Sequence, residues 1–275
     1  MIRKTGTARD WVVAMTALAF ALQSGSGAVL TTGSFTQPDF ENGGTTMLEG
    51  VGYSDQGTGS FTLDGSNEGL WLLGDLNSSS NGYFLDNTPM TGNSSIYMNP
   101  KNSNLRGFVQ HLDAGVDKWT GNTTLSIDYV GDGSDDGAGA DPADDYQFFT
   151  FVAFAWNDTD TSPSLDIHDS GSTLFTTTPN NYNGLGAVFT SAVPTHIAET
   201  THIITTDQTG SNPWLTTQVT LDLGVTGYDN FAIMVAADGG GIWFDNLQVI
   251  PEPSHLALLG IGGMAFCLRR RRHAA

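Results

Sequence analysis

The chain of 275 residues is acidic, with 29 Asp and Glu against ten Lys and Arg and a formal net charge of −19. Such a surface repels phosphate backbones, so the composition excludes nucleic acid as a partner. A single cysteine excludes an internal disulfide and a thiolate metal site.

The first 28 residues have the layout of a secretory signal peptide. Three cationic side chains precede an apolar stretch over residues 11–22, and residues 26–28 are small, as a cleavage site requires. The alternative is an N-terminal membrane anchor, but the apolar stretch is shorter than the ~20 residues that a span needs. The sequence therefore predicts a cleaved signal over residues 1–28 and an exported protein.

Residues 29–250 are predicted to form one extracytoplasmic domain, since about 220 residues suffice for a single large core. This part holds 27 of the 29 acids and three cationic side chains (Lys101, Arg106 and Lys118), which gives it a net charge of −24. The acids are mainly Asp, which favours turns and calcium loops, whereas Glu favours helices. The composition therefore indicates a soluble, helix-poor domain.

Alternating or β-branched runs recur along this domain between turn residues, and they predict strands. Thr123–Val130 places its apolar side chains on one face, as in a half-buried antiparallel strand. Gln147–Trp156 is nearly continuously apolar, which predicts a central strand buried on both faces. Further strands are predicted at Ser60–Leu63, Gly69–Leu73, Ser95–Met98, Gly107–Leu112, Ser164–His168, Thr173–Thr177, His202–Thr205, Leu215–Leu223, Asn230–Ala236 and Gly241–Val249. The pattern indicates an all-β, antiparallel β-sandwich, to which an N-terminal signal helix and a C-terminal hydrophobic helix are added at the two ends of the chain.

Three motifs follow one another in the order "SFTQPDFENG", "GFVQHLDAGVDKWTGNTTLSIDYVGD" and "LTTQVTLDLGVTGYDNFAIMVAADGGGIWFDNLQV". In these motifs the chain resembles jelly-roll modules of the galactose-binding-like, carbohydrate-binding type. The resemblance implies a jelly roll, and for some members a sugar ligand. It also implies a structural Ca²⁺ that ties the first strand to the last, for which Glu41 and Asp245 are the matching ligands.

A second candidate for calcium is the acidic segment 132–145. Asp132, Ser134 and Asp136 precede Gly137, a spacing that places alternate oxygens on one side of a tight turn. The segment lacks the closing Glu of a full calcium loop. The alternative is an acidic hairpin loop without a metal, and the acidic, glycine-rich composition favours that alternative.

Sugar binding requires exposed aromatic rings that stack on the apolar faces of pyranose rings. Trp119 and Trp214 stand in loop-like contexts and are the candidates for a carbohydrate site. Trp71, Trp156 and Trp243 fall in predicted strands and are expected in the core, because tryptophan buries a large area.

Sequence motifs of known catalytic sites are absent: there is no H-E-x-x-H and no G-x-S-x-G. His196 and His202 lie six residues apart in a threonine-rich segment and are expected to be solvent-exposed. A glycosidase needs two carboxylates about 5–10 Å apart, and no motif indicates such a pair. The sequence therefore favours a non-catalytic protein, with a carbohydrate-binding module as the first alternative and a secreted glycan hydrolase as the second.

The last 25 residues combine Pro251-Glu252-Pro253, an apolar run over Leu256–Leu268 and a cationic block. The block consists of Arg269, Arg270, Arg271 and Arg272. Arginine beside a membrane stays on the cytoplasmic side, so the preceding domain lies outside. The apolar run is short for a bilayer, as expected of a segment that awaits processing.

This tail resembles the PEP-CTERM sorting signals of Gram-negative bacteria. The resemblance implies an exosortase-type membrane transpeptidase as a partner, with cleavage near Pro251-Glu252-Pro253. It also implies that residues 251–275 hold the protein in the inner membrane before processing. The processed protein is then expected in the cell envelope or in an extracellular polysaccharide matrix or biofilm.

Overall fold

The computed structural model describes residues 28–36, 40, 53–56, 59–73, 83–86, 95–98, 105–131, 147–169, 184–191, 193–204, 214–238 and 241–250. Both predicted terminal helices and the predicted strand Thr173–Thr177 lie outside these residues. Within the described part, no helix has the length and apolarity that a membrane crossing requires.

The described residues form fourteen strands and two short 3-10 helices. They are η1 (Thr32–Ser34), β1 (Tyr53–Asp55), β2 (Phe61–Thr62), β3 (Trp71–Leu73), β4 (Tyr83–Asp86), β5 (Ser95–Met98), β6 (Leu105–Asp113), β7 (Asn122–Gly131), β8 (Gln147–Trp156), β9 (Ser164–Leu165), β10 (His168–Asp169), η2 (Leu185–Ala187), β11 (His196–Ile204), β12 (Leu215–Asp222), β13 (Asn230–Asp238) and β14 (Ile242–Ile250).

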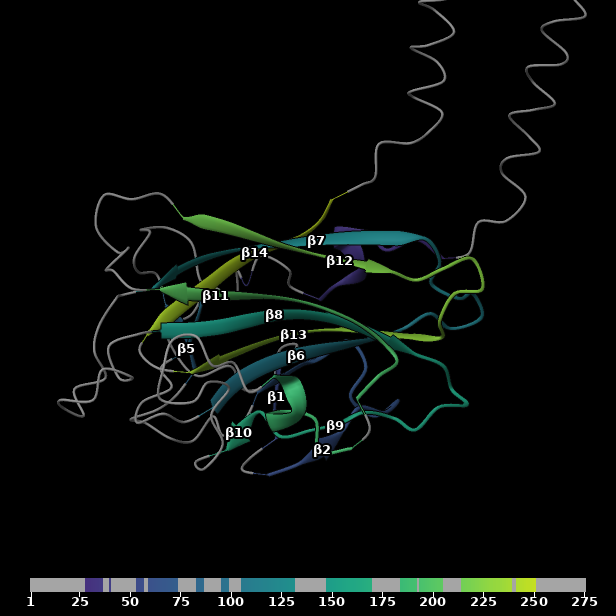
Figure 1. Ribbon diagram of the computed structural model, residues 1–275, viewed down its shortest axis with the longest axis horizontal. Helices are drawn as coiled ribbons and strands as arrows, with labels where there is room; N and C mark the ends of the chain where they lie inside the picture. The colour runs from purple at the N-terminus through teal and green to yellow at the C-terminus, as the bar shows by residue number, and fades with distance from the viewer. Residues whose placement is uncertain are drawn as a thin grey trace, which may run out of the picture.

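Two sheets lie face to face (Figure 1). One has the order β1-β3-β6-β13-β8-β11, with β10 also paired to β6, and the other has the order β12-β7-β14-β5-β4. The long pairs are antiparallel, whereas β1 and β3 are parallel. Successive long strands alternate between the sheets, from β6 through β7 to β8 and from β11 through β14, as in a jelly roll. The predicted all-β, antiparallel sandwich is confirmed.

Strand β8 confirms the prediction of a central strand buried on both faces. All ten of its residues are buried, and it pairs with β13 on one side and β11 on the other. Phe149 and Phe151 face the core between the sheets, whereas Phe154 and Trp156 face a second apolar cluster. That second cluster is completed by residues near β2, β9 and η2, which lie below the seven-stranded sheet in Figure 1.

The five-stranded sheet has one buried and one polar face. In β7, Leu125, Ile127 and Tyr129 enter the core, as the alternation in the sequence predicted. On the outer face, the Thr124 and Thr220 hydroxyls lie 2.8 Å apart, and the Thr216 hydroxyl donates to Asp128 at 2.6 Å. Cross-strand pairs therefore satisfy these polar groups on the outer face.

Strands β1, β4 and most of β11 were not predicted. Strand β11 begins at His196 rather than at His202, and it pairs with β8 along its whole length. It is the edge strand of its sheet and most of its residues are half-buried or exposed. Because threonine, histidine and glutamate occupy five of its nine positions, the apolar alternation that marks a strand is weak.

Candidate functional site

Of the predicted calcium ligands, Glu41, Asp132, Ser134 and Asp136 lie outside the described residues, and Asp245 lies in β14. The Asp245 side chain is buried, and its Oδ1 accepts the N–H of Asn246 at 2.6 Å. The register of β14 shifts just after it. Among the described residues, no group of three or more His, Cys, Asp and Glu is arranged to hold a metal. Structural calcium remains a prediction.

The predicted exposure of Trp119 is wrong. Its side chain is 8% exposed and packs in the core, while its backbone N–H donates to the Tyr228 carbonyl at 2.8 Å. A buried ring cannot stack on a sugar, so Trp119 no longer qualifies as a platform. Trp214 lies half-buried just before β12 and remains the candidate. The strand tryptophans Trp71, Trp156 and Trp243 are buried, as predicted.

The predicted solvent exposure of His196 and His202 is also wrong, because both are half-buried where the two sheets meet. The His202 ring stacks on Phe149 at 5.0 Å, its Nε2 contacts the Thr217 hydroxyl, and burial lowers its pKa. His196 Nδ1 lies 3.1 Å from the Asp222 carbonyl. Both side chains thus connect β11 to β12 and serve the fold.

A polar network near one end of the sandwich had no signal in the sequence. His111 is buried, its Nε2 lies 3.0 Å from Asn230 Oδ1, and Asn230 Nδ2 donates to Asp158 at 2.8 Å. Lys118 pairs with Asp229 at 3.2 Å. Because its members come from four separate segments, only the tertiary fold brings them together.

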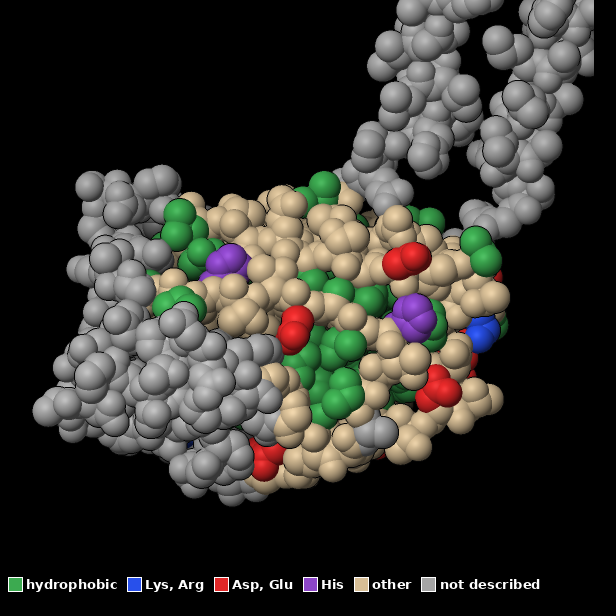
Figure 2. Space-filling view, viewed as in Figure 1, with side chains coloured by type: hydrophobic (Ala, Val, Ile, Leu, Met, Phe, Trp, Pro, Cys, Tyr) green, Lys and Arg blue, Asp and Glu red, His purple; other side chains and the backbone are tan. Residues whose placement is uncertain are grey.

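Glu68 and Asp113 line a shallow pocket of about 350 Å³ near this network. Desolvation raises the pKa of the Glu68 carboxyl, and the charge of Asp113 acts in the same direction. Both side chains are exposed. In the view of Figure 2 the acidic side chains are scattered over the surface rather than gathered in one cleft.

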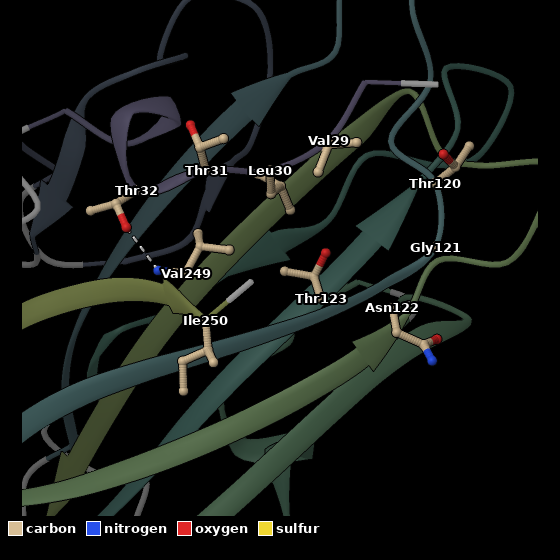
Figure 3. Close-up of a pocket in the computed structure, with 10 residues that line it drawn as sticks. All are labelled: Val29, Leu30, Thr31, Thr32, Thr120, Gly121, Asn122, Thr123, Val249 and Ile250. Atoms are coloured by element: carbon tan, nitrogen blue, oxygen red, sulfur yellow. Dashed lines mark hydrogen bonds between the residues drawn. The ribbon is translucent and has the colours of Figure 1, made fainter. Parts of the chain in front are cut away.

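A groove of about 540 Å³ lies where the start of the described chain meets the end of β14 (Figure 3). Its lining residues are Val29, Leu30, Thr31, Thr32, Thr120, Gly121, Asn122, Thr123, Val249 and Ile250. None of these described residues is titratable, so the groove offers methyl groups, hydroxyls and one amide. It is suited to binding and not to acid–base chemistry.

Hydrogen bonds hold the two walls of this groove together. The Ala28 N–H donates to the Lys118 carbonyl at 3.0 Å beside the β6–β7 connection, a bond that cleavage of the predicted signal after residue 28 would remove. The Val249 N–H donates to the Thr32 hydroxyl at 3.0 Å, the dashed line in Figure 3. Leu30 and Thr123 are buried in the floor, whereas Val29 is 68% exposed at the rim. The end of β14 is therefore braced by residues 29–32, which we call the N-terminal segment.

The sequence model of the PEP-CTERM protein-sorting motif matches residues 249–272. The match contains Pro251-Glu252-Pro253 and all four arginines, as the resemblance of the tail implied. The motif indicates an exported protein that depends on an exosortase for sorting. No curated protein matches the chain.

Solved structures that align with the chain include carbohydrate-binding modules. CBM4 aligns at 12% identity and TM-score 0.33 over 70% of this chain and 95% of the other. TmCBM61 in complex with β-1,4-galactotriose aligns at 11% identity and TM-score 0.30 over 70% and 88%. A cyclase from Fischerella sp. TAU aligns at 16% identity and TM-score 0.39 over 80% and 96%. Because these values are low, no residue role is transferred from them. The chain is a β-sandwich protein with a PEP-CTERM sorting motif that begins in the last two residues of strand β14.

Proposed function

We propose that this protein is a non-catalytic component of the cell envelope or extracellular matrix, delivered through the PEP-CTERM route of a Gram-negative-type bacterium. A cleaved signal at residues 1–28 exports it, and the run Leu256–Leu268 with its arginines holds it in the inner membrane. An exosortase then cuts near Pro251-Glu252-Pro253. The released sandwich associates with exopolysaccharide or biofilm.

One observation carries this proposal: the sorting motif starts at the end of the last described strand. Strand β14 ends at Ile250, and the other described strands lie before it in the chain. Cleavage at 251–253 would therefore leave all the described strands of both sheets in place. A domain whose described strands all precede the cleavage site can keep its fold after the tail is removed, as expected of a protein that is released after sorting.

The charge of the exported part supports a neutral partner. With a net charge of −24 over residues 29–250, the domain repels acidic glycans and anionic lipid. The same charge keeps a released domain soluble at high local concentration. A neutral polysaccharide is thus the matrix component that this surface tolerates best.

The test is to express the full chain in a bacterium that carries an exosortase and in the same strain without it. We expect a shorter, envelope-associated or released form only where the exosortase is present. A matched variant with Arg269–Arg272 changed to Gln should accumulate as unprocessed or mislocalised precursor, because the stop-transfer charge is lost. Processing that is unaffected by the missing exosortase would contradict the proposal.

A carbohydrate-binding module is the first alternative, and half-buried Trp214 is the residue that would contact sugar. Calorimetric titration of the protein with neutral glycans, with and without calcium, addresses both the sugar and the proposed structural Ca²⁺. Binding that disappears in a Trp214→Ala variant would favour the module. Heat of binding with Ca²⁺ alone would support a cation site.

A glycan hydrolase is the second alternative, favoured only by the shared pocket of Glu68 and Asp113 and the raised pKa of the Glu68 carboxyl. A hydrolase would release reducing ends from a polysaccharide and lose that activity in Glu68→Gln. We expect no release by either the natural protein or the variant.

A further inference from the structure

We propose that the groove beside Ile250 is the docking surface for the processing enzyme, so that sorting depends on the folded sandwich as well as on the tail. This inference rests on the proposed function, in which an exosortase is the partner. It adds that the enzyme contacts residues far from the motif in sequence, above all Asn122 and the N-terminal segment.

The sorting motif overlaps the last strand of the sandwich, β14. The match begins at Val249, and both Val249 and Ile250 are still paired to β7, opposite Leu125 and Thr124. The Val249 N–H also donates to the Thr32 hydroxyl. The first two residues of the motif are thus held in a strand, and both line the groove.

The proposed cleavage site also lies close to the groove. An extended chain advances at most about 3.3–3.6 Å per residue, so every bond within Pro251–Pro253 lies within roughly 10 Å of Ile250. A folded enzyme is much wider than this distance. When its active site reaches the cleavage site, its surface must therefore touch the sandwich around Ile250, and the groove is the hollow at that place (Figure 3).

The side chains that line the groove also suit a contact with another protein. The lining combines Val29, Leu30, Val249 and Ile250 with threonine hydroxyls and carries no charged side chain, although the exported part has a net charge of −24. An apolar side chain of a partner can enter without desolvating an ion. A partly apolar patch without charged side chains and with a polar rim has the composition of a protein–protein contact.

The test uses the full chain in the exosortase-bearing strain, with processing followed by pulse-chase and immunoblot. Asn122 is exposed at the rim of the groove, so Asn122→Trp adds a large ring to this surface without entering the core. The matched control is Thr190→Trp, an exposed position beside η2 near the second apolar cluster. We expect Asn122→Trp to slow processing about tenfold, the cost of one good interface contact, and Thr190→Trp to leave it unchanged.

A second groove variant, Thr31→Trp, enters from the opposite wall and should slow processing as well. Thermal unfolding of all variants shows whether the folded state is retained. Processing of folded Asn122→Trp and Thr31→Trp at the natural rate would overturn the docking surface and leave the proposed function intact. Failure of the natural chain to be processed would overturn the proposed function itself.

Discussion

The two sheets of the sandwich use their outer faces differently. The outer face of the seven-stranded sheet is covered by a second apolar cluster near β2, β9 and η2, so that β8 is buried on both sides. The outer face of the five-stranded sheet carries paired threonines and amides and stays open along β12. One sheet is therefore an internal layer and the other is a surface.

The end of the molecule that carries the sorting motif lies beside the open sheet. The N-terminal segment and the end of β14 meet beside the open sheet, and the sorting motif continues from there. The covered sheet buries side chains on both faces, whereas under the proposal above the open sheet presents the tail to the processing enzyme. Stability and sorting would then depend on different layers of the same fold.

The largest expected effect tests whether the covered sheet really has two cores. Phe149 faces the core between the sheets, and Phe154 faces the second cluster; both are fully buried. Replacing either by Ala should lower the free energy of unfolding by about 3–5 kcal/mol, from lost burial and a cavity. Urea unfolding of the two variants measures this. A cost below about 1 kcal/mol for Phe154→Ala would show that the second cluster is not a core.

A smaller effect tests the brace at the open sheet. Thr32→Val removes the acceptor of the Val249 N–H and should lower the free energy of unfolding by about 1 kcal/mol. Thr226→Val, in the exposed turn after β12, is the control and should stay within about 0.5 kcal/mol, because this side chain is exposed. Equal losses in the two variants would mean that the N-terminal segment does not brace the last strand.

The free energy of unfolding should depend on pH because His202 is half-buried where the two sheets meet. Burial lowers the pKa of His202 below its ordinary value, so the folded state favours the neutral ring. The stabilisation is therefore present above the unfolded pKa, near 6.5, and is lost as pH falls toward the folded pKa. Urea unfolding between about pH 7 and 5 should show declining stability, with a shallower decline in His202→Gln. An unchanged slope in that variant would mean that His202 does not contribute to the pH dependence of the free energy of unfolding.

The sequence predicted best where burial leaves a simple pattern. The apolar run of β8 and the alternation of β7 both identified their faces correctly, because each side chain of a strand has only two directions. Prediction failed at β11, whose polar residues are held by backbone pairing with β8 rather than by apolar contacts.

The candidate site was predicted in part. The sorting motif is local in sequence, so its residues could be recognised without a fold. Trp119 was misjudged because its turn-like neighbours gave no sign of its pairing with Tyr228 and Ala28. The groove joins residues near position 30, position 121 and position 250, and only the tertiary structure brings them together.

The most direct test of the central claim is the intact mass of the mature protein, purified from exosortase-bearing cells. We expect a chain that begins near Val29, ends at or just after Ile250 and lacks Arg269–Arg272. Peptide mapping of both ends locates the cuts. A mature chain that still carries the apolar run and the arginines would contradict the claim that this sandwich is released by processing of its tail.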